Sequence, residues 1–214
     1  ERIHRLVGER TQARAAVSHD LRTPLTRLRL RLDHVEDPAG RRAMASDLDD
    51  MQAMVDATLA YLGGDADPEP RQVTNVASSL MGVADAGRAV AYGGPGRALA
   101  TVRPVAFRRA LENLVDNGVR YGARVRIALA AEETALVLRI DDDGPGIPAC
   151  DVACAFEPFT RLEGSRNRNT GGTGLGLTIA RRAVEAEGGT LILTTRPEGG
   201  LRAEIRVPRA GRGG

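Results

Sequence analysis

The chain has 214 residues, of which 42% are apolar and 27% charged, with a formal net charge of +2. This length fits one or two globular domains, and the interleaving of its arginines with acids does not indicate nucleic-acid binding. No run of about 18 uncharged apolar residues occurs, and no signal-peptide pattern opens the chain. Because it begins at Glu1 without methionine, we expect a soluble piece of a longer protein.

The first 35 residues are expected to form one long helix. Apolar residues recur in it at alternating steps of four and three, the spacing of a face that packs on a partner helix: Leu21, Leu25, Leu28, Leu32 and Val35. His19 lies about 160° around the helix from this seam, with Asp20 beside it and Thr23 one turn later. A lone exposed histidine is usually only a surface residue. Pro24 frees the carbonyl of Asp20 at a cost of about 3 kcal/mol, and a tolerated defect at this place indicates a site.

A second helix is expected at residues 41–62, after a turn over residues 36–40. Its apolar residues also follow a three-and-four spacing: Leu48, Met51, Val55 and Leu62. The two helices should therefore pair antiparallel as a hairpin. Since two helices alone bury little apolar surface, we expect the hairpin to dimerise into a four-helix bundle. The alternative is an intramolecular hairpin docked on the second domain.

A linker rich in glycine and proline, residues 63–70, precedes a domain in which strands and helices alternate. Strands are expected near residues 71–74, 89–92, 99–102, 124–130, 135–141, 190–195 and 201–207, and helices at 76–86, from Pro104 onward and at 174–187. The order predicts an α/β sandwich with helices on one sheet face. The whole chain is then of the α+β class, with a helical hairpin at 1–62, a second domain at 71–209 and a flexible tail at 210–214.

Two cysteines occur, Cys150 and Cys154, with no histidine nearby to complete a zinc site. We expect both to be small buried or half-buried residues in a reducing cytosol.

The helix after Pro104 carries polar residues suited to a nucleotide. Asn113 and Asn117 lie one turn apart, with Arg120 and Tyr121 next along that side. Carboxamides supply oxygen to Mg²⁺ or amide donors to phosphate, and arginine adds positive charge. Because helix interiors rarely favour asparagine, its repetition asks for a functional reason.

Two glycine-rich segments follow. The first is Asp-Asp-Asp-Gly-Pro-Gly-Ile-Pro at residues 141–148, where a carboxylate can accept a hydrogen bond from an exocyclic amine and the glycines let the backbone approach a flat ring. The second is Gly-Gly-Thr-Gly-Leu-Gly-Leu at 171–177, which leads into a helix whose amino end suits phosphate. Neither segment is a standard phosphate-binding fingerprint, and each alone is weak evidence for a nucleotide site.

Taken together, these motifs resemble a known family. Ser-His-Asp-Leu-Arg-Thr-Pro at residues 18–24 resembles the phosphoacceptor helix of sensor histidine kinases. The three later segments, in this order and spacing, resemble the N, G1 and G2 boxes of the histidine-kinase ATP-binding domain, whose fold is shared with gyrase, Hsp90 and MutL ATPases. Phe-Glu-Pro-Phe at 156–159 lies where an F box is expected. The resemblance covers nearly the whole chain.

This resemblance implies a site for ATP and Mg²⁺. Asn117 would bind Mg²⁺, Asn113 and Arg120 would assist at the phosphates, and Asp142 would hold the adenine amine. The other residues implied at the nucleotide are Tyr121, Gly144, Gly146, Ile147, Gly172, Thr173, Gly174, Leu175, Gly176 and Leu177. Residues from about 150 to 171 would form a lid. The chain departs from the family at Gly118, where alanine is usual, and the acids flanking Asp142 are expected to raise a carboxylate pKa.

The activity implied is ATP-dependent autophosphorylation of His19, with Asp20 orienting the ring or taking its other proton. The phosphoryl group would pass to an aspartate of a response regulator receiver domain, and Thr23 would position water for dephosphorylation of that regulator. The resemblance further implies a homodimer and the cytoplasmic portion of a bacterial inner-membrane sensor, linked to the membrane only through missing N-terminal segments.

Two other functions stay open. A non-catalytic signalling scaffold is disfavoured by the intact Asn117, Asp142 and glycine boxes. An ATPase or serine kinase on the same nucleotide fold would not need the His19 helix.

Overall fold

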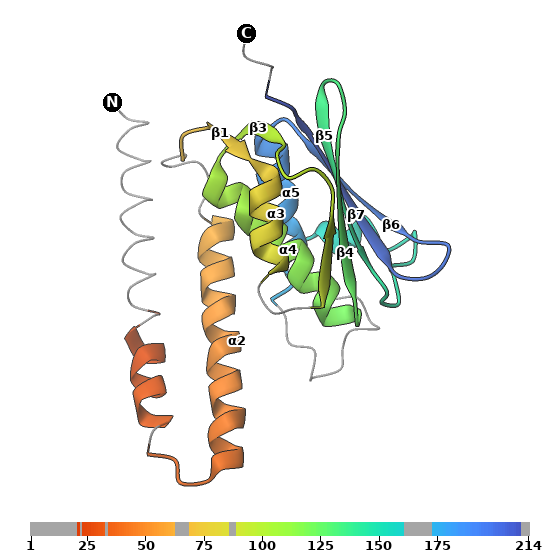
Figure 1. Cartoon of the computed structure of the whole chain (residues 1–214). Coiled ribbons are helices and arrows are strands. Elements are labelled where there is room, and N and C mark those ends of the chain that lie inside the picture. Colours follow the sequence, from red (N-terminus) through yellow and green to blue (C-terminus); the bar gives the residue numbers. More distant parts are fainter. Residues whose placement is uncertain are drawn as a thin grey trace. The chain divides into compact units, whose positions relative to one another are not determined.

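The computed structural model describes residues 21, 23–32, 34–62, 69–85, 89–160 and 173–210. The chain divides into two compact units, one formed by Glu1–Pro68 with Gly171–Leu175 and the other by Glu69–Thr170 with Gly176–Gly214. Figure 1 traces the elements of both units in chain order. Of the helices in the described part, none is long and apolar enough to cross a membrane.

The first unit contains a helical hairpin. Residues 23–32 are helical, and α2 spans Pro38–Leu62, so the two helices that the apolar spacing predicts are present in the described residues. The turn between them is shorter than expected, because residues 38–40 belong to α2. Asp37 accepts a hydrogen bond from the backbone N–H of Gly40 at 2.8 Å, and Pro38 occupies the first helical position. An aspartate cap followed by proline starts a helix, which is why the predicted turn over 36–40 is wrong in its second half.

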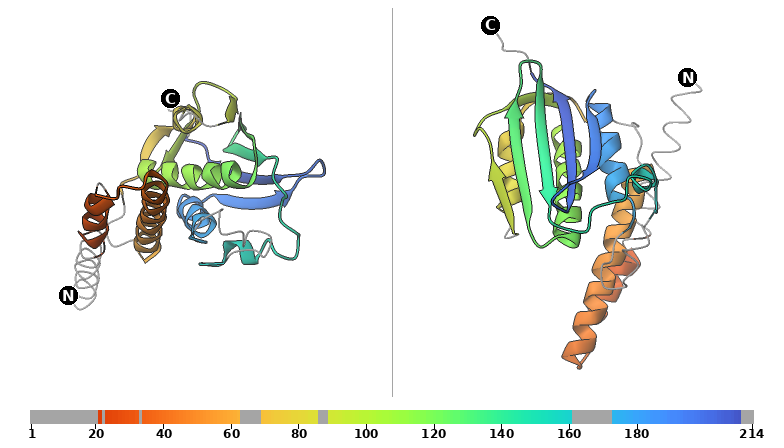
Figure 2. Two further views of the ribbon diagram at one scale, coloured as in Figure 1. Left: turned by 90° about the horizontal axis from the view of Figure 1, so that it is seen from below. Right: turned by 90° about the vertical axis from the view of Figure 1, so that its right-hand side faces the viewer.

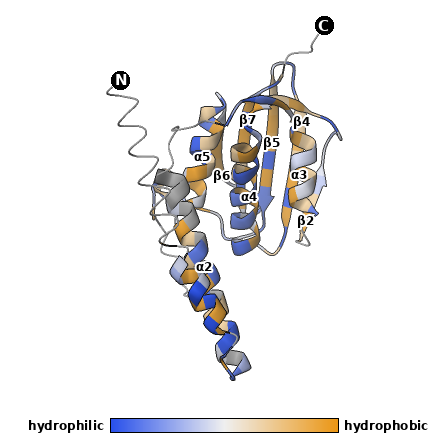
Figure 3. Cartoon of the chain, turned by 90° about the vertical axis from the view of Figure 1, so that its left-hand side faces the viewer, coloured by the Kyte–Doolittle hydropathy of each residue, from blue (hydrophilic) through white to orange (hydrophobic). Residues whose placement is uncertain are grey.

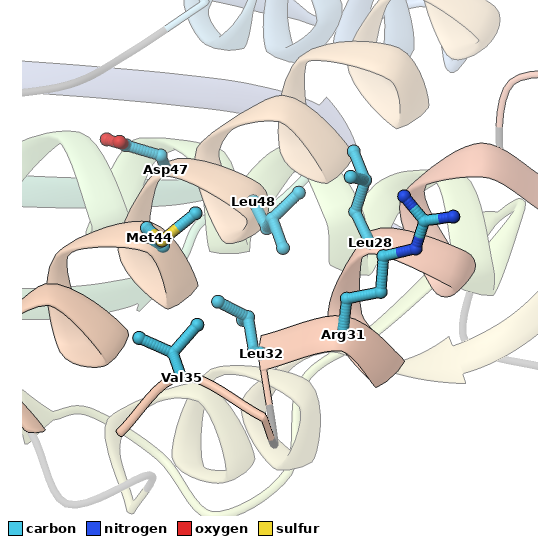
Figure 4. Close-up of a pocket in the computed structure, with 7 residues that line it drawn as sticks. All are labelled: Leu28, Arg31, Leu32, Val35, Met44, Asp47 and Leu48. Carbon is cyan, nitrogen blue, oxygen red and sulfur yellow. The ribbon is translucent and has the colours of Figure 1, made fainter. Parts of the chain in front are cut away.

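The hairpin closes its apolar seam only in part. Leu25 and Leu32 are buried, whereas Leu21 and Leu28 are each 43% exposed. In Figure 3, hydrophobic residues recur along α2 between hydrophilic ones. A groove of about 290 Å³ runs between the two arms, lined by Leu28, Arg31, Leu32, Val35, Met44, Asp47 and Leu48 (Figure 4). One copy of the hairpin therefore leaves apolar side chains in contact with water.

The second unit is built on a five-stranded sheet of order β2-β4-β5-β7-β6. These strands are β2 (Val90–Gly93), β4 (Val125–Ala131), β5 (Ala135–Asp142), β6 (Thr190–Thr195) and β7 (Leu201–Pro208). β2 is parallel to β4, and the other neighbours are antiparallel. A separate two-stranded sheet pairs β1 (Gln72–Asn75) with β3 (Leu99–Val102).

The helices of this unit cover one face of the sheet, as the right-hand view of Figure 2 shows. They are α3 (Val76–Ala84), α4 (Pro104–Tyr121) and α5 (Gly176–Ala186), with a short 3₁₀ turn, η1, at Cys154–Phe156. This arrangement confirms the predicted α/β sandwich. α5 begins two residues later than expected, because Gly174 has a φ of 68°, which no right-handed helix contains.

The core lies between the sheet and the helices. The inward face of α4 presents Phe107, Ala110, Leu111, Leu114 and Val115, all buried. On β4, buried Val125, Ile127 and Leu129 alternate with exposed residues, the period of a sheet with one wet face. This packing fixes α4 along the sheet and leaves Asn113 and Asn117 half-buried at the edge of its inward face.

Buried and capping charges fix the ends of α4 and α5. The Glu187 side chain, only 1% exposed, accepts from Arg71 Nε at 2.8 Å and from Arg103 Nη1 at 3.1 Å. Glu69 accepts from the backbone N–H groups of Val105 and Ala106, which satisfies free donors at the start of α4. The two helices that carry the candidate site are therefore held at their ends away from it.

Candidate active site

The candidate phosphoacceptor residues His19 and Asp20 lie outside the described residues. Thr23 and Pro24 are described and both are exposed on the helix formed by residues 23–32. The helix continues beyond Pro24, as the sequence predicts for this motif.

Asn113 carries an unusual polar group. Its side-chain nitrogen is buried and has no hydrogen-bond partner among the described residues. The start of α5 lies directly against it, because a Cβ added to Gly176 would lie 3.8–3.9 Å from Asn113 side-chain atoms. A buried amide without a partner costs about 1–3 kcal/mol, so a ligand that supplied an acceptor here would recover that energy. The donor set therefore suits a phosphate between α4 and the start of α5.

The described residues just before α5, 173–175, have an irregular backbone. Leu175 N–H donates to Thr173 Oγ1 at 3.3 Å, and Gly174 adopts its left-handed φ between them. The first turn of α5 contains no acidic residue, so nothing in it offsets the positive end of the helix. Leu177 packs on the hydrophobic core. Gly172 lies outside the described residues.

Asp142 ends β5 as a buried carboxylate, 7% exposed. Its Oδ1 accepts from the backbone N–H of Gly144 at 2.8 Å and of Leu201 at 3.1 Å. Within the described part of the chain, no donor bonds Oδ2. One oxygen is thus fixed by the protein, and the other is available to a donor such as an exocyclic amine.

The pKa of Asp142 is raised, chiefly by burial, with a smaller contribution from the charge of Asp143. The two backbone hydrogen bonds and the charge of Arg196 oppose this shift. From the sequence we expect a raised carboxylate pKa, but we attribute the shift to the flanking acids, which contribute less than burial does. The pKa of Asp143 itself is lowered, first by the N–H of Arg124, and Asp141 is paired with Arg202 at 2.6 Å. Burial, rather than crowding of like charges, sets the chemistry of Asp142.

The loop after Asp142 needs its glycines. A Cβ on Gly144 would lie 2.7 Å from the carbonyl oxygen of Tyr121, at the end of α4. Gly146 has a φ of 73°, and a Cβ there would lie 2.7 Å from Thr195 Cγ2. Ile147 N–H donates to Thr195 Oγ1 at 3.0 Å. The structure therefore brings this loop against the end of α4 on one side and β6 on the other.

The turn after this loop carries the two cysteines of the chain. Cys150 and Cys154 are exposed, so the prediction that they are buried or half-buried is wrong. The turn directs Val152, Ala155 and Phe156 to the core instead, at spacings of three and four. Thr178 Oγ1 of α5 donates to the carbonyl of Phe156 at 2.8 Å, and Arg181 lies over the Phe156 ring. Residues 161–171 of the expected lid lie outside the described residues.

Among the described residues, no group of three or more histidines, cysteines, aspartates or glutamates could hold a metal ion. A Mg²⁺ ion bound through one amide oxygen and nucleotide phosphates needs no such group, because Mg²⁺ usually keeps several waters. The half-buried Asn117 is compatible with that kind of site.

The geometry agrees with the comparison to known families. Residues 102–211, about half of the chain, match the family described as "Histidine kinase-, DNA gyrase B-, and HSP90-like ATPase". The chain belongs to this family. The residues that match this family form α4, the loop after Asp142, α5 and the β6–β7 hairpin.

The likeness to histidine kinases extends over both units. The sensor histidine kinase GtrS of Pseudomonas aeruginosa is 39% identical over 99% of this chain and 44% of its own length. The histidine kinase domain of the Escherichia coli osmosensor EnvZ is 30% identical, with a TM-score of 0.53, over 71% of this chain and 95% of that domain. Full-length ShkA, crystallised with AMPPNP, has a TM-score of 0.71 at 23% identity over 93% of this chain and 46% of its own. The chain thus spans less than half of GtrS.

Sequence reasoning missed the residues outside the boxes that support Asp142. Thr195, Arg196 and Leu201 all contact residues 142–147 from the β6–β7 hairpin. The Glu-Gly-Gly turn at 198–200 indicates a hairpin, but nothing local indicates that this hairpin reaches a strand end more than fifty residues earlier.

Gly118, where the chain departs from the family pattern, lies at a close contact between α4 and the sheet. A Cβ at this position would lie 2.9 Å from Val125 Cγ2 and 3.5 Å from the Cβ of Asp142. Val125 is 2% exposed, and a β-branched side chain has little freedom to turn away. The glycine therefore lets α4 approach β4 and β5 at the level of Asp142.

We expect Gly118→Ala to destabilise the protein. Overpacking costs about 1–3 kcal/mol while alanine returns about 1 kcal/mol of helix propensity, so the free energy of unfolding should fall by about 1 kcal/mol. Gly82→Ala in α3 is the matched control, because a Cβ there meets nothing within 4 Å. It should stabilise by about 0.5–1 kcal/mol in the same urea titration. Equal stabilisation by both variants would contradict the contact at Val125.

Proposed function

We propose that this chain is the catalytic part of a sensor histidine kinase that uses ATP to phosphorylate itself on His19. The observation that carries the proposal is the buried Asp142, which has Oδ1 bonded to two backbone amides and Oδ2 open to a donor. The match to the ATPase family and the likeness to GtrS and EnvZ support the same activity.

ATP would bind along α4, from its Tyr121 end to the side that carries Asn113. Asp142 would accept from the adenine amine, in a pocket shaped by Gly144, Gly146 and Ile147. The Asn113 amide nitrogen, which has no partner among the described residues, would contact the phosphates near the start of α5 together with Arg120. Asn117 would hold Mg²⁺, which would spread the charge that develops on the transferring oxygens. The nucleotide analogue bound by the structural relative ShkA supports a nucleotide in this fold.

The chemistry on the protein side is a phosphoryl transfer to an imidazole. The γ-phosphoryl group bonds to a ring nitrogen of His19 as its bond to the bridging oxygen of ADP breaks. The neutral ring is the nucleophile, so Asp20 would orient it or accept its other proton. Catalysis would come mainly from positioning, because the reaction needs little covalent help from the protein.

We further propose that the helical hairpin forms a homodimer. Apolar side chains that should be covered remain about half exposed along both helices: Leu21, Leu28, Met44, Met51 and Met54. The groove in Figure 4 adds an apolar depression beside them. A second hairpin packed on this face would complete a four-helix bundle and bury these side chains.

The partner that receives the phosphoryl group would be an aspartate of a response regulator receiver domain. The longer protein would be a bacterial inner-membrane sensor whose cytoplasmic portion is this chain, since the chain covers less than half of relatives named as sensors.

Autophosphorylation is tested by incubating the chain with Mg²⁺ and γ-labelled ATP. The label should be lost in acid and survive in base, because a phosphoimidazole is acid-labile. His19→Ala should abolish labelling, whereas His34→Ala, an exposed histidine of the same unit, should leave it unchanged. Label that is stable in acid, or that persists in His19→Ala, would instead favour a serine kinase. Release of phosphate from ATP without label would favour an ATPase, and nucleotide binding with neither label nor hydrolysis would favour the scaffold.

A role of Thr23 in dephosphorylating the regulator gives a separate prediction. Thr23→Ala should lower phosphatase activity toward a phosphorylated receiver domain by at least about tenfold, because a positioned water is lost. Its autophosphorylation should stay near the unchanged level. Thr26→Ala, an exposed threonine on the same helix, is the control. A parallel loss of both activities in Thr23→Ala would refute the assignment.

A further inference from the structure

The turn of the β6–β7 hairpin is built tightly around the end of β5. Arg196 N–H donates to the carbonyl of Gly200 at 2.9 Å, and Gly199 N–H donates to the carbonyl of Arg196 at 3.0 Å. Gly199 and Gly200 both have left-handed backbones, with φ of 95° and 91°. A Cβ on Gly200 would collide with the carbonyl oxygen of Asp142. The turn therefore lies in direct contact with the backbone of the adenine-site aspartate.

Arg196 adds a side chain to this contact. Its Nη1 donates to the carbonyl oxygen of Asp142 at 3.0 Å, and its Nη2 pairs with Glu198. The side chain is only 17% exposed, and its Nε is buried without a hydrogen-bond partner in the described residues, 4.0 Å from Asp141 Oδ2. An arginine that served only the turn could keep its head group in water. This one is turned inward, to the strand end.

We propose that Arg196 is a positioning residue for nucleotide selection, holding the end of β5 so that Asp142 presents Oδ2 to the exocyclic amine of an adenine base. The inference rests on the proposed ATP site. Arg196 fixes the carbonyl of Asp142, and the adjoining Leu201 N–H fixes Oδ1, so both bonds come from one hairpin. With the backbone and one oxygen fixed, the direction of the second oxygen is also fixed.

The positive charge of Arg196 also favours the ionised form of Asp142. Burial raises the pKa of Asp142, and the positive charge of Arg196 opposes that shift. The ionised carboxylate is an acceptor only, whereas the protonated acid would also present a donor. An ionised Asp142 favours a base that brings an amine over one that brings a carbonyl; the charge of Arg196 is the smallest influence on this ionisation, and its direct bond to the Asp142 carbonyl is its main contribution.

Affinities for Mg-ATP and Mg-ITP test this role, because inosine carries a carbonyl where adenine carries the amine. We would titrate both nucleotides into the unmodified chain and into Arg196→Met by calorimetry. The unmodified chain should prefer ATP. Arg196→Met should weaken ATP by about fivefold, the value of one ordinary hydrogen bond, with ITP changed by less than about twofold.

Arg202→Met is the matched control. Arg202 lies on the same hairpin and donates two hydrogen bonds to the Asp141 carboxylate, of 2.7 and 2.6 Å. Within the described residues it makes no hydrogen bond to Asp142. Its loss should leave the ratio of the two affinities unchanged. Arg196→Lys, which keeps the charge and a donor, should recover most of the ATP preference. Should Arg196→Met not fold, Arg196→Gln takes its place with the same expectation.

The possible outcomes distinguish a failure of the positioning role of Arg196 from a failure of the proposed ATP site. A folded Arg196→Met that keeps the full ATP preference, or weakens both nucleotides equally, overturns the positioning role and leaves the ATP site intact. Failure of the unmodified chain to bind ATP would instead refute the proposed function itself. A preference lost in Arg196→Met and recovered in Arg196→Lys would support the inference.

Discussion

The candidate site depends on one buried carboxylate. Taking Asp142 out of water is costly, and backbone amides from two different segments, at Gly144 and Leu201, offset part of that cost at a single oxygen. Those bonds require a glycine loop on one side and a hairpin turn on the other. Three further groups lie against the same residue: the left-handed Gly200, Gly118 of α4 and the inward Arg196.

Helix α4 connects the two glycine segments. Its Tyr121 end touches the loop at Gly144, and its Asn113 side touches the start of α5 at Gly176. The same helix is held to the core by its apolar face and at its start by Glu69. Helix α4 therefore carries Asn113, the proposed phosphate-binding group, and contacts the loop that follows Asp142, the proposed base-binding group of β5.

Local patterns predicted most of the fold, and contacts between distant residues account for most of the differences. The bounds expected for β3 and β6 match the structure because alternation and turn residues define short strands. The start of α2 was misplaced because Asp37-Pro38 signals both a turn and a helix cap. The exposure of the cysteines and the reach of the hairpin to Asp142 depend on tertiary packing. The motifs indicated Asp142, but no neighbouring residue indicated Arg196.

The account is tested most directly by a crystal structure of the chain with Mg²⁺ and a non-hydrolysable ATP analogue. It predicts the adenine amine at about 2.8–3.1 Å from Asp142 Oδ2, with Oδ1 still bonded to the two backbone amides. A nucleotide bound with its base away from Asp142, or with both carboxylate oxygens turned from it, would contradict the account.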